Sequence, residues 1–581
     1  MKQRNILALG LISVLLLSAV CVAAGQEPQA AQRSSRSNAT ASSPRVDINI
    51  YADPTTLDPA LATDTSANRG IEQLFVGLVD LDDETAEVQP ELATSWTVSP
   101  DATVYTFTLR SDATWSDGNP ITAGDVRYGI LRSLDIGADY AASMLSVIRN
   151  AQAYHQGNVT ADQVGVTALA ATSLRIELEY PAAYALSVLA QPCARPVPEW
   201  TIDAHGGGWT TLANIVTSGP YLLTEWDHSH YMLLNKNPDY FDADDVQIER
   251  VKMWMVDEPS GLQMYRDGVI ETTGIPLDEM SAIRRDPLLS QELHIAPTPC
   301  TYYYGFSVSE EPFDDPLVRK AFIAATDRRG LINNILQGGQ QPALTYTSPG
   351  IFGHVDGYEA GVGIPYNPTQ AQQWLSAAGY PGGAGLPSVT LWHNESPGHQ
   401  AIAEYIRNGW ATILGADVSL NGSLSWIDYL GELEKGDFPV WRLGYCADYP
   451  EASNYLSDGV RPGDYGGWDN PTYWALLDQA SRTEDPTLRA AIYKDAERIL
   501  VETDAVMLPL YYHTSVQLTK PYLERTYAAG LGDIATWRIT RASGTVDSAG
   551  GQGSSYDGDT IVAVPQGAFT TTTVITHTPT N

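Results

Sequence analysis

Cysteine is scarce in this chain, with four residues in 581. Cys21 falls inside an N-terminal apolar segment, which leaves Cys193, Cys300 and Cys446 in the body of the protein. Three cysteines can form at most one internal disulfide. This scarcity excludes the small secreted scaffolds that several disulfides hold together. With 43% hydrophobic residues, the chain can build large hydrophobic cores instead.

Apolar runs long enough to cross a membrane are also missing. The longest, within residues 1–24, has an apolar core of about 15 residues, whereas a membrane-spanning helix needs about 20. Residues 1–24 have the pattern of a secretory signal, with Lys2 and Arg4 before the apolar core and small residues up to Ala24 after it. The sequence therefore predicts an exported protein, in a compartment where disulfides persist.

A lipid attached to Cys21 is the alternative to cleavage after Ala24. Such a lipid would tether the exported chain to the membrane. Val20 precedes this cysteine, whereas lipoprotein signals usually carry glycine or alanine at that position. The sequence therefore favours a cleaved protein of the periplasm or cell surface, and it leaves anchoring through Cys21 open.

Positive charge is in short supply. The chain has 34 basic residues against 69 acidic ones, a net charge of −35, and only seven of the basic residues are lysines. This charge repels nucleic acids and anionic membrane surfaces, so neither is expected as a partner. An acidic, lysine-poor surface fits a high-salt habitat, although high genomic GC content also replaces lysine by arginine.

Catalytic and metal-binding motifs are absent. The chain has no HExxH, GxSxG or P-loop motif, its ten histidines are scattered, and its acidic clusters lack the spacing of a calcium loop. We therefore expect no enzyme activity, no metal site and no cofactor. Because 69 acidic residues guarantee carboxylate pairs, a secreted hydrolase of peptides or glycans remains the alternative from another class.

The segments that are present indicate a mixed α/β protein. Residues 25–45 are polar and predict a disordered linker, and residues 542–581 are a low-complexity extension. Apolar and polar residues alternate over 104–109, which predicts a strand. Apolar residues recur at helical spacing over 400–414. A second helix is expected to begin at Pro486, with Asp485 as its N-cap and with an apolar face formed by Leu488, Ile492, Ile499 and Leu500.

Several motifs in order resemble a known family. These motifs include Leu57-Asp58-Pro59, Gln73-Leu74-Phe75-Val76-Gly77-Leu78, Trp115-Ser116-Asp117-Gly118, Asn237-Pro238-Asp239-Tyr240-Phe241 and Pro312-Phe313-Asp314-Asp315-Pro316. Over residues 46–540 the chain resembles the extracytoplasmic solute-binding proteins of family 5, the peptide/nickel class. Members of this class deliver solutes to ATP-binding-cassette importers.

The resemblance implies a bilobal periplasmic-binding-protein fold of the class with an extra domain, in which ligand binds in a cleft between hinged lobes. Domain I would be discontinuous, and the other two domains would be continuous. The implied boundaries are 46–77, 200–299 and 515–541 for domain I, 78–199 for domain II, and 300–514 for domain III. We expect a monomer that meets permease and ATPase subunits at the membrane.

The sequence segments around Cys300 and Cys446 are similar to those of the peptide-binding members. The resemblance implies that these cysteines form a disulfide and that Cys193 is free and buried. It also implies that Asp448 binds the α-amino group of a peptide and that Arg442 binds its carboxylate. From the residues alone, Asp448 could instead be a solvated loop acid or a cap, and Arg442 could form a structural ion pair.

Other ligand contacts follow from the same resemblance. Trp426 would border a side-chain pocket, His399 would meet the ligand's C-terminus, and Tyr140 would face the cleft from the smaller lobe. Backbone groups around Gly444 and Tyr445 would pair with the ligand. Trp426 could instead be core, and Tyr140 an ordinary surface aromatic.

The function implied is the capture of oligopeptides for import, without chemistry on the ligand. The same fold also holds oligosaccharides, nickel chelates, haem or opines, so a non-peptide solute remains an alternative. Leu336 stands where relatives carry a lysine that meets the carboxylate of longer peptides. The preferred peptide length therefore stays open.

Overall fold

The computed structural model describes residues 44–539, except 137–138, 434, 437, 462 and 528–531, together with four short strands between residues 543 and 576. The predicted signal, Cys21 and most of the predicted linker and C-terminal extension lie outside the described residues. The first strand, β1 (Arg45–Asn49), begins at the last residue assigned to the linker. The linker prediction was therefore one residue too long at that end.

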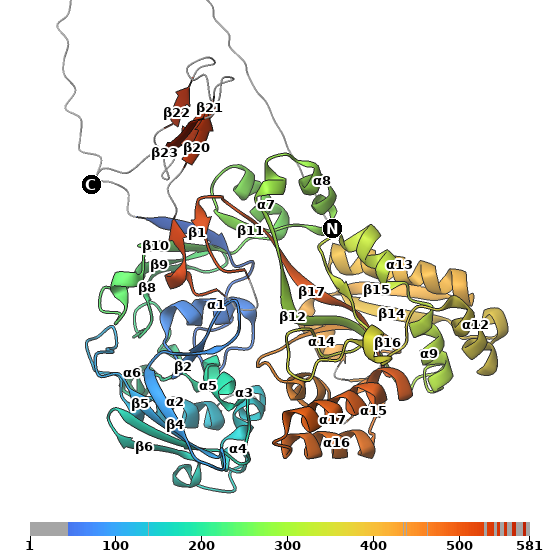
Figure 1. Ribbon diagram of the computed structural model, residues 1–581, viewed down its shortest axis with the longest axis horizontal. Coiled ribbons are helices and arrows are strands. Elements are labelled where there is room, and N and C mark those ends of the chain that lie inside the picture. Colours follow the sequence, from blue (N-terminus) through green and yellow to red (C-terminus); the bar gives the residue numbers. More distant parts are fainter. Residues whose placement is uncertain are drawn as a thin grey trace, which may run out of the picture. The chain divides into compact units, whose positions relative to one another are not determined.

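Eleven strands form one large sheet (Figure 1). Ten of them lie in a continuous order, and β13 (Gln341–Pro342) pairs with the side of β17. The continuous order is β15 (Val418–Leu424), β14 (Val389–Asn394), β16 (Val440–Cys446), β12 (Leu293–Phe306), β17 (Met507–Thr519), β11 (Thr272–Gly274), β1, β10 (Arg250–Trp254), β9 (Tyr231–Lys236) and β8 (Tyr221–Asp227).

The two longest strands, β12 and β17, run side by side and join the two halves of this sheet (Figure 1). β12 pairs with β17 from Leu293 onwards and with β16 from Cys300 to its end. β17 in turn pairs with β11 near Thr519. The expected domain boundaries at 299/300 and 514/515 therefore fall inside continuous strands, so any motion between the halves must involve these two strands.

The remaining strands form smaller sheets. The strand expected over 104–109 is present as β5 (Val104–Leu109), with Tyr105, Phe107 and Leu109 buried, so this prediction is confirmed. β5 belongs to a four-stranded sheet with β4 (Ala93–Val98), β7 (Ser173–Glu177) and β6 (Val166–Ala170). The two-stranded sheets are β2 (Val79–Leu81) with β3 (Val88–Pro90), β18 (Leu523–Glu524) with β19 (Arg538–Ile539), β20 (Ser543–Val546) with β23 (Thr573–Thr576), and β21 (Gly551–Ser554) with β22 (Ile561–Val564).

The described helices are numbered in chain order. They are α1 (Thr65–Leu74), α2 (Ala123–Ile136), α3 (Asp139–Met144), α4 (Ala151–His155), α5 (Ala185–Leu189), α6 (Glu199–His205), α7 (Glu258–Arg266), α8 (Met280–Arg285), α9 (Pro316–Ala324), α10 (Arg328–Leu331), α11 (Gly357–Ala360), α12 (Pro368–Ala377), α13 (Pro397–Leu414), α14 (Trp426–Leu433), α15 (Asp464–Gly467), α16 (Pro471–Ser481) and α17 (Pro486–Arg498). No helix among the described residues is long and apolar enough to cross a membrane.

The helix predicted from Pro486 is α17, and the Asp485 side chain caps it by accepting from the backbone N–H groups of Thr487 and Leu488. Ile492 and Leu500 are buried as expected. Leu488 is 51% exposed, so its assignment to the buried face was wrong. It lies in the first turn, where Pro486 and Thr487 are exposed as well. The helix predicted over 400–414 is the larger part of α13, whose Trp410 is fully buried.

Buried apolar residues gather in five clusters. One cluster is built from residues 78–194 and also includes Tyr449. Two clusters come from residues 302–511, and the other two are built mainly from residues 46–283 and completed by residues 518–537. We keep the three-domain division as a proposal, which these separate cores support.

Candidate functional site

A disulfide joins Cys300 on β12 to Cys446 at the end of β16. The two cysteines are direct partners in the antiparallel register, followed by the pairs Thr301–Tyr445 and Tyr302–Gly444. Cys193 is free and buried, as expected. The bond holds the end of β16 against β12, immediately before the turn that carries Asp448.

One edge of β16 is open over most of its length. β12 pairs with β16 from Val440 to Cys446, whereas β14 pairs with it only at Val440 and Trp441. The Tyr429 hydroxyl accepts from the Arg442 backbone N–H at 3.0 Å and donates to the Arg442 carbonyl at 2.8 Å. Backbone groups alternate in direction along an antiparallel strand, so those of Gly444 and Cys446 point the same way as those of Arg442. They therefore face away from β12, toward the open edge.

The Asp448 carboxylate lies just beyond this edge, held by neutral donors. Tyr140 donates to its Oδ1 at 2.7 Å, and Asn454 and Tyr445 donate to its Oδ2 at 3.3 and 3.5 Å. Its backbone carbonyl accepts from the Gln191 side chain at 2.6 Å. Among the described residues no cation pairs with this carboxylate. Burial raises the pKa of Asp448, and the three hydrogen bonds act against that rise.

A second carboxylate lies close to the first. Asn454 Nδ2 donates to both Asp448 and Asp458, and Tyr449 also donates to Asp458 at 2.9 Å. Burial raises the pKa of Asp458 to about 6, and the neighbouring charge of Asp448 acts in the same direction. Two carboxylates that share the Asn454 side-chain amide as a donor therefore lie beyond the end of β16.

Arg442 provides positive charge at the other end of the open edge. Its Nη1 donates to Asn394 Oδ1 at 3.1 Å, and its guanidinium lies 4.7 Å from the centre of the Tyr302 ring. The Nε atom is buried and has no hydrogen-bond partner. Within the described part of the chain, no carboxylate pairs with Arg442. A guanidinium in this state suits a planar, bidentate anion such as a carboxylate.

Two neutral histidines accompany this arginine. His399 Nδ1 lies 3.2 Å from the Tyr302 hydroxyl. Burial lowers the pKa of His399 to about 3 and that of His513 to about 4, and the Arg442 charge acts in the same direction in both. A Cβ on Gly444 would lie 3.9 Å from the His513 ring and 3.8 Å from Arg442. At neutral pH, Arg442 therefore carries a charge while His399 and His513 do not.

The structure places all seven expected ligand-binding residues around β16. Tyr140 and Tyr445 surround Asp448, while His399 and Gly444 adjoin Arg442. Trp426 is 46% exposed at the start of α14, so it is not core, and its ring stacks on that of Tyr429. Their contacts with a ligand stay predictions.

Several neighbours of these residues were missed from the sequence. Asn394, His513 and Gln191 belong to distant segments without a motif of their own. Asn454 and Asp458 follow Asp448 by six and ten residues, so their nearness was within reach of the sequence. Leu336 is buried in the hydrophobic cluster that spans residues 302–511, so its side chain packs in a core. Among the described residues no group of three or more His, Cys, Asp or Glu side chains is placed to hold a metal ion.

Comparisons with known proteins agree with this fold. The model of bacterial extracellular solute-binding proteins, family 5, matches residues 87–467. The oligopeptide-binding protein OppA of Bacillus subtilis is 30% identical over 549 residues, which cover 92% of this chain and 98% of that protein. The probable deoxycholate-binding periplasmic protein YgiS of Escherichia coli is 33% identical over 485 residues, which cover 82% of this chain and 89% of that protein.

A solved structure matches as well. The periplasmic oligopeptide-binding protein OppAIV of Borrelia burgdorferi superposes with a TM-score of 0.77 at 28% identity, covering 85% of this chain and all of that chain. The fold is thus that of the extracytoplasmic binding proteins, mixed α/β as expected. The chain belongs to family 5 of the bacterial extracellular solute-binding proteins. It is a solute-binding protein and not an enzyme.

Proposed function

We propose that this protein captures short peptides by both of their charged ends and delivers them to a membrane permease of the ATP-binding-cassette type. The observation that carries the proposal is the pair of unmatched charges on β16 and the turn that follows it. Asp448 and Arg442 lie at opposite ends of the open β16 edge, and neither has an oppositely charged partner among the described residues. A peptide with a free α-ammonium and a free carboxylate matches both charges.

The backbone of the open edge would hold the middle of the peptide. An extended peptide adds to such an edge as a further strand, and main-chain hydrogen bonds supply affinity that does not depend on sequence. The outward-facing groups of Gly444 and Cys446 are suited to this pairing. Glycine at 444 keeps a side chain off the surface between Arg442 and His513, where a ligand backbone would lie.

The spacing of the two charges limits peptide length. Arg442 and Asp448 are six residues apart, and six extended residues span at most about 20 Å. Because the peptide is itself extended, a ligand held at both ends has at most about six residues. Longer peptides would lose one terminal contact, since Leu336 offers no further cation.

Relatives support the peptide assignment and also supply its competitor. OppA of B. subtilis and OppAIV of B. burgdorferi carry names that describe oligopeptide binding, whereas YgiS is named for deoxycholate. Deoxycholate has a carboxylate but no ammonium, so it could use Arg442 while leaving Asp448 unmatched. The paired charges favour the peptide.

Native mass spectrometry of the purified protein tests the proposal directly. We expect co-purified ligands whose masses correspond to peptides of up to about six residues. Added tripeptides should bind saturably in calorimetry, while deoxycholate should not compete with them. A single co-purified solute without an amino group, or tight deoxycholate binding with none for peptides, would contradict it.

Affinity for peptides is expected to depend on pH through the acidic end of the site. Burial raises the pKa of Asp448 and raises that of Asp458 to about 6. The ammonium binds the ionised carboxylate of Asp448, so affinity should fall as the pH is lowered through the raised pKa of this group, by up to tenfold per pH unit for each proton taken up. The pKa values of His399 and His513, lowered to about 3 and about 4, keep both rings neutral at neutral pH.

Calorimetry of one tripeptide between pH 4.5 and 8 would measure this dependence. In the Asp448→Asn variant most of the decline should disappear, because the titrating partner of the ammonium is gone. An equal decline in both proteins would show that another group governs the pH response.

A further inference from the structure

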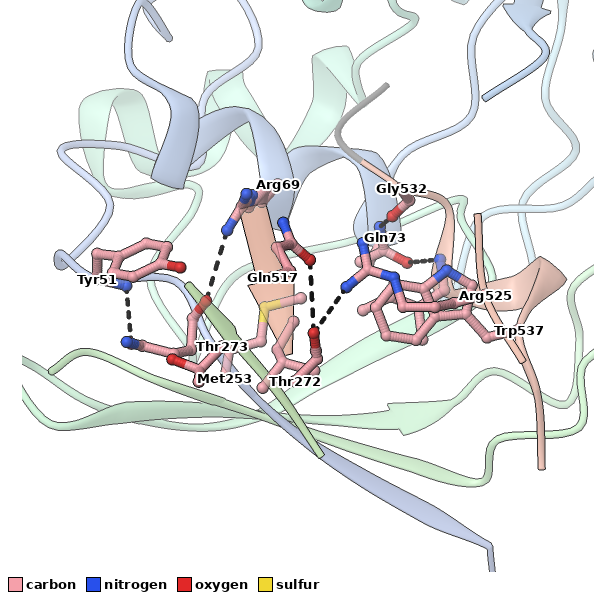
Figure 2. Close-up of a pocket in the computed structure, with 13 residues that line it drawn as sticks. Tyr51, Arg69, Gln73, Met253, Thr272, Thr273, Gln517, Arg525, Gly532 and Trp537 are labelled. Atoms are coloured by element: carbon pink, nitrogen blue, oxygen red, sulfur yellow. Dashed lines mark hydrogen bonds between the residues drawn. The ribbon is translucent and has the colours of Figure 1, made fainter. Parts of the chain in front are cut away.

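A second, small pocket lies away from the β16 edge, where α1, β1, β11 and the segment after β17 meet. Its volume is about 30 Å³, and none of the seven proposed peptide contacts lines it. Figure 2 shows its polar lining, in which Arg69 and Arg525 appear on either side of Gln517, above Thr272. The peptide site gives no role to this pocket.

The two arginines are held by neutral groups. Arg69 Nη1 donates to the Asn49 carbonyl at 3.5 Å. Arg525 donates through Nη1 to Thr272 Oγ1 at 3.1 Å and through Nε to the Thr526 carbonyl at 3.0 Å. Among the described residues, neither arginine forms an ion pair. This is unexpected in a chain with twice as many acidic as basic residues.

Further donors in the lining are unsatisfied. Arg69 Nε and Trp537 Nε1 are buried without a hydrogen-bond partner. Trp537 is only 2% exposed, so bulk water does not reach its indole N–H. Buried donors without acceptors are rare in folded proteins, and each calls for a partner. Two cations and two open donors around one cavity together describe a site for an acceptor with negative charge.

The nearest carboxylates do not fill this role. Asp83 Oδ2 accepts from Thr526 Oγ1 at 2.8 Å and from the Asp533 backbone N–H at 3.0 Å. Asp83 does not line the pocket. Glu258 lies beside Tyr51, since a Cβ added to Gly274 would be 2.6 Å from Tyr51 Oη and 3.7 Å from Glu258 Oε1. Burial lowers the pKa of Arg525 to about 10, the like charge of Arg69 adds to this effect, and the charge of Asp83 acts against it. None of the described residues that line the pocket carries a carboxylate that would offset the repulsion between the two guanidinium groups.

We propose that this pocket binds one small monovalent inorganic anion, of the size of chloride, between Arg69 and Arg525. Its volume leaves room for about two water-sized groups, which is too small for peptides, sugars and nucleotides. Arginine and buried indole donors bind anions through charge-assisted hydrogen bonds.

The anion would connect α1 to the segment that contains Arg525 and Trp537. Arg69 belongs to α1, and Arg525 and Trp537 belong to the segment that returns to α1 after β17. Gln73 on α1 already binds this segment, donating to the Gly532 carbonyl at 3.2 Å and accepting from the Ile534 N–H at 3.0 Å. An anion beside Gln73 adds a second connection between the same two elements, so its binding should stabilise the folded state.

Thermal unfolding of the full-length mature protein measures this effect. Chloride replaces gluconate at constant ionic strength, so that general screening does not change. We expect a saturable rise in Tm of about 3 °C at chloride concentrations far above Kd. The rise should be absent in Arg69→Met and in Arg525→Met, and retained in Arg285→Met, which removes an exposed arginine of α8. Equal Tm values in both salts, or a rise that persists in both pocket variants, would overturn the proposal.

Crystals of the unaltered protein grown with bromide supply a test that does not depend on the variants folding. An anomalous peak between Arg69 and Arg525 is expected, because bromide is only slightly larger than chloride. Bromide peaks elsewhere on the molecule, with none in this pocket, would refute the site.

Discussion

Asp448→Asn is expected to weaken peptide binding by about 30- to 700-fold, equivalent to about 2–4 kcal/mol. The asparagine keeps the shape of the side chain and can still accept from Tyr140. It lacks the charge that would balance the buried α-ammonium, and an unpaired buried cation is costly. Calorimetry with a tripeptide measures the loss, and circular dichroism checks that the variant remains folded.

Peptides with a blocked terminus show which terminal contact a variant has lost. The unaltered protein should bind an N-acetylated tripeptide more weakly than the free tripeptide. Asp448→Asn should bind the two peptides equally well. Arg442→Met should give the mirror result, losing the preference for a free carboxylate over a C-terminal amide. Asp478→Asn, at an exposed position of α16, serves as the control with unchanged affinity. If Asp448→Asn bound free and acetylated peptides as the unaltered protein does, the ammonium would lie elsewhere.

Replacing both Cys300 and Cys446 by alanine is expected to lower the free energy of unfolding by about 3–5 kcal/mol. The disulfide closes a loop with a sequence separation of 146 residues. In the chain-entropy model, a disulfide that closes a loop of this length restricts the unfolded chain. Its removal therefore stabilises the unfolded state by roughly 5 kcal/mol. Denaturant unfolding, followed by tryptophan fluorescence, measures the change. Peptide affinity should fall as well, because the turn that presents Asp448 is no longer held against β12.

Cys193→Ala provides the matched control for this experiment. Cys193 is buried and free, so its replacement tests the loss of a cysteine side chain without the loss of a bond. We expect a change below about 1.5 kcal/mol, as for a small change in core volume. A double variant no less stable than Cys193→Ala would show that the disulfide does not stabilise the fold.

Local features of the fold were predictable because they depend on neighbours in sequence. The strand at 104–109 and the cap at Asp485 follow from alternation and from N-cap chemistry, which act over a few residues. Leu488 shows the limit of this reasoning. Its spacing fits the apolar face of α17, but the sequence does not reveal where the covering element ends.

The site was predictable only where a motif carried it. The residues near Cys446 form one segment, so the resemblance could transfer Arg442, Gly444, Tyr445 and Asp448 together. The partners that were missed come mainly from distant segments, as with Gln191, which is 257 residues from Asp448. No local pattern links such residues, because their contact depends on how separate elements pack.

By itself, the sequence determined that at most one disulfide can form among Cys193, Cys300 and Cys446 and that the fold is of the mixed α/β class. Its resemblance to family 5 indicated the segment around Cys446 as the one that would meet a ligand. These follow from composition, short-range periodicity and one continuous motif. Only the tertiary structure decided that β16 has an open edge, that Asp448 and Arg442 lack opposite charges, and that Arg69 and Arg525 share a pocket. Each of these depends on groups far apart in the chain, whose charges and hydrogen bonds can be matched only after the chain has folded.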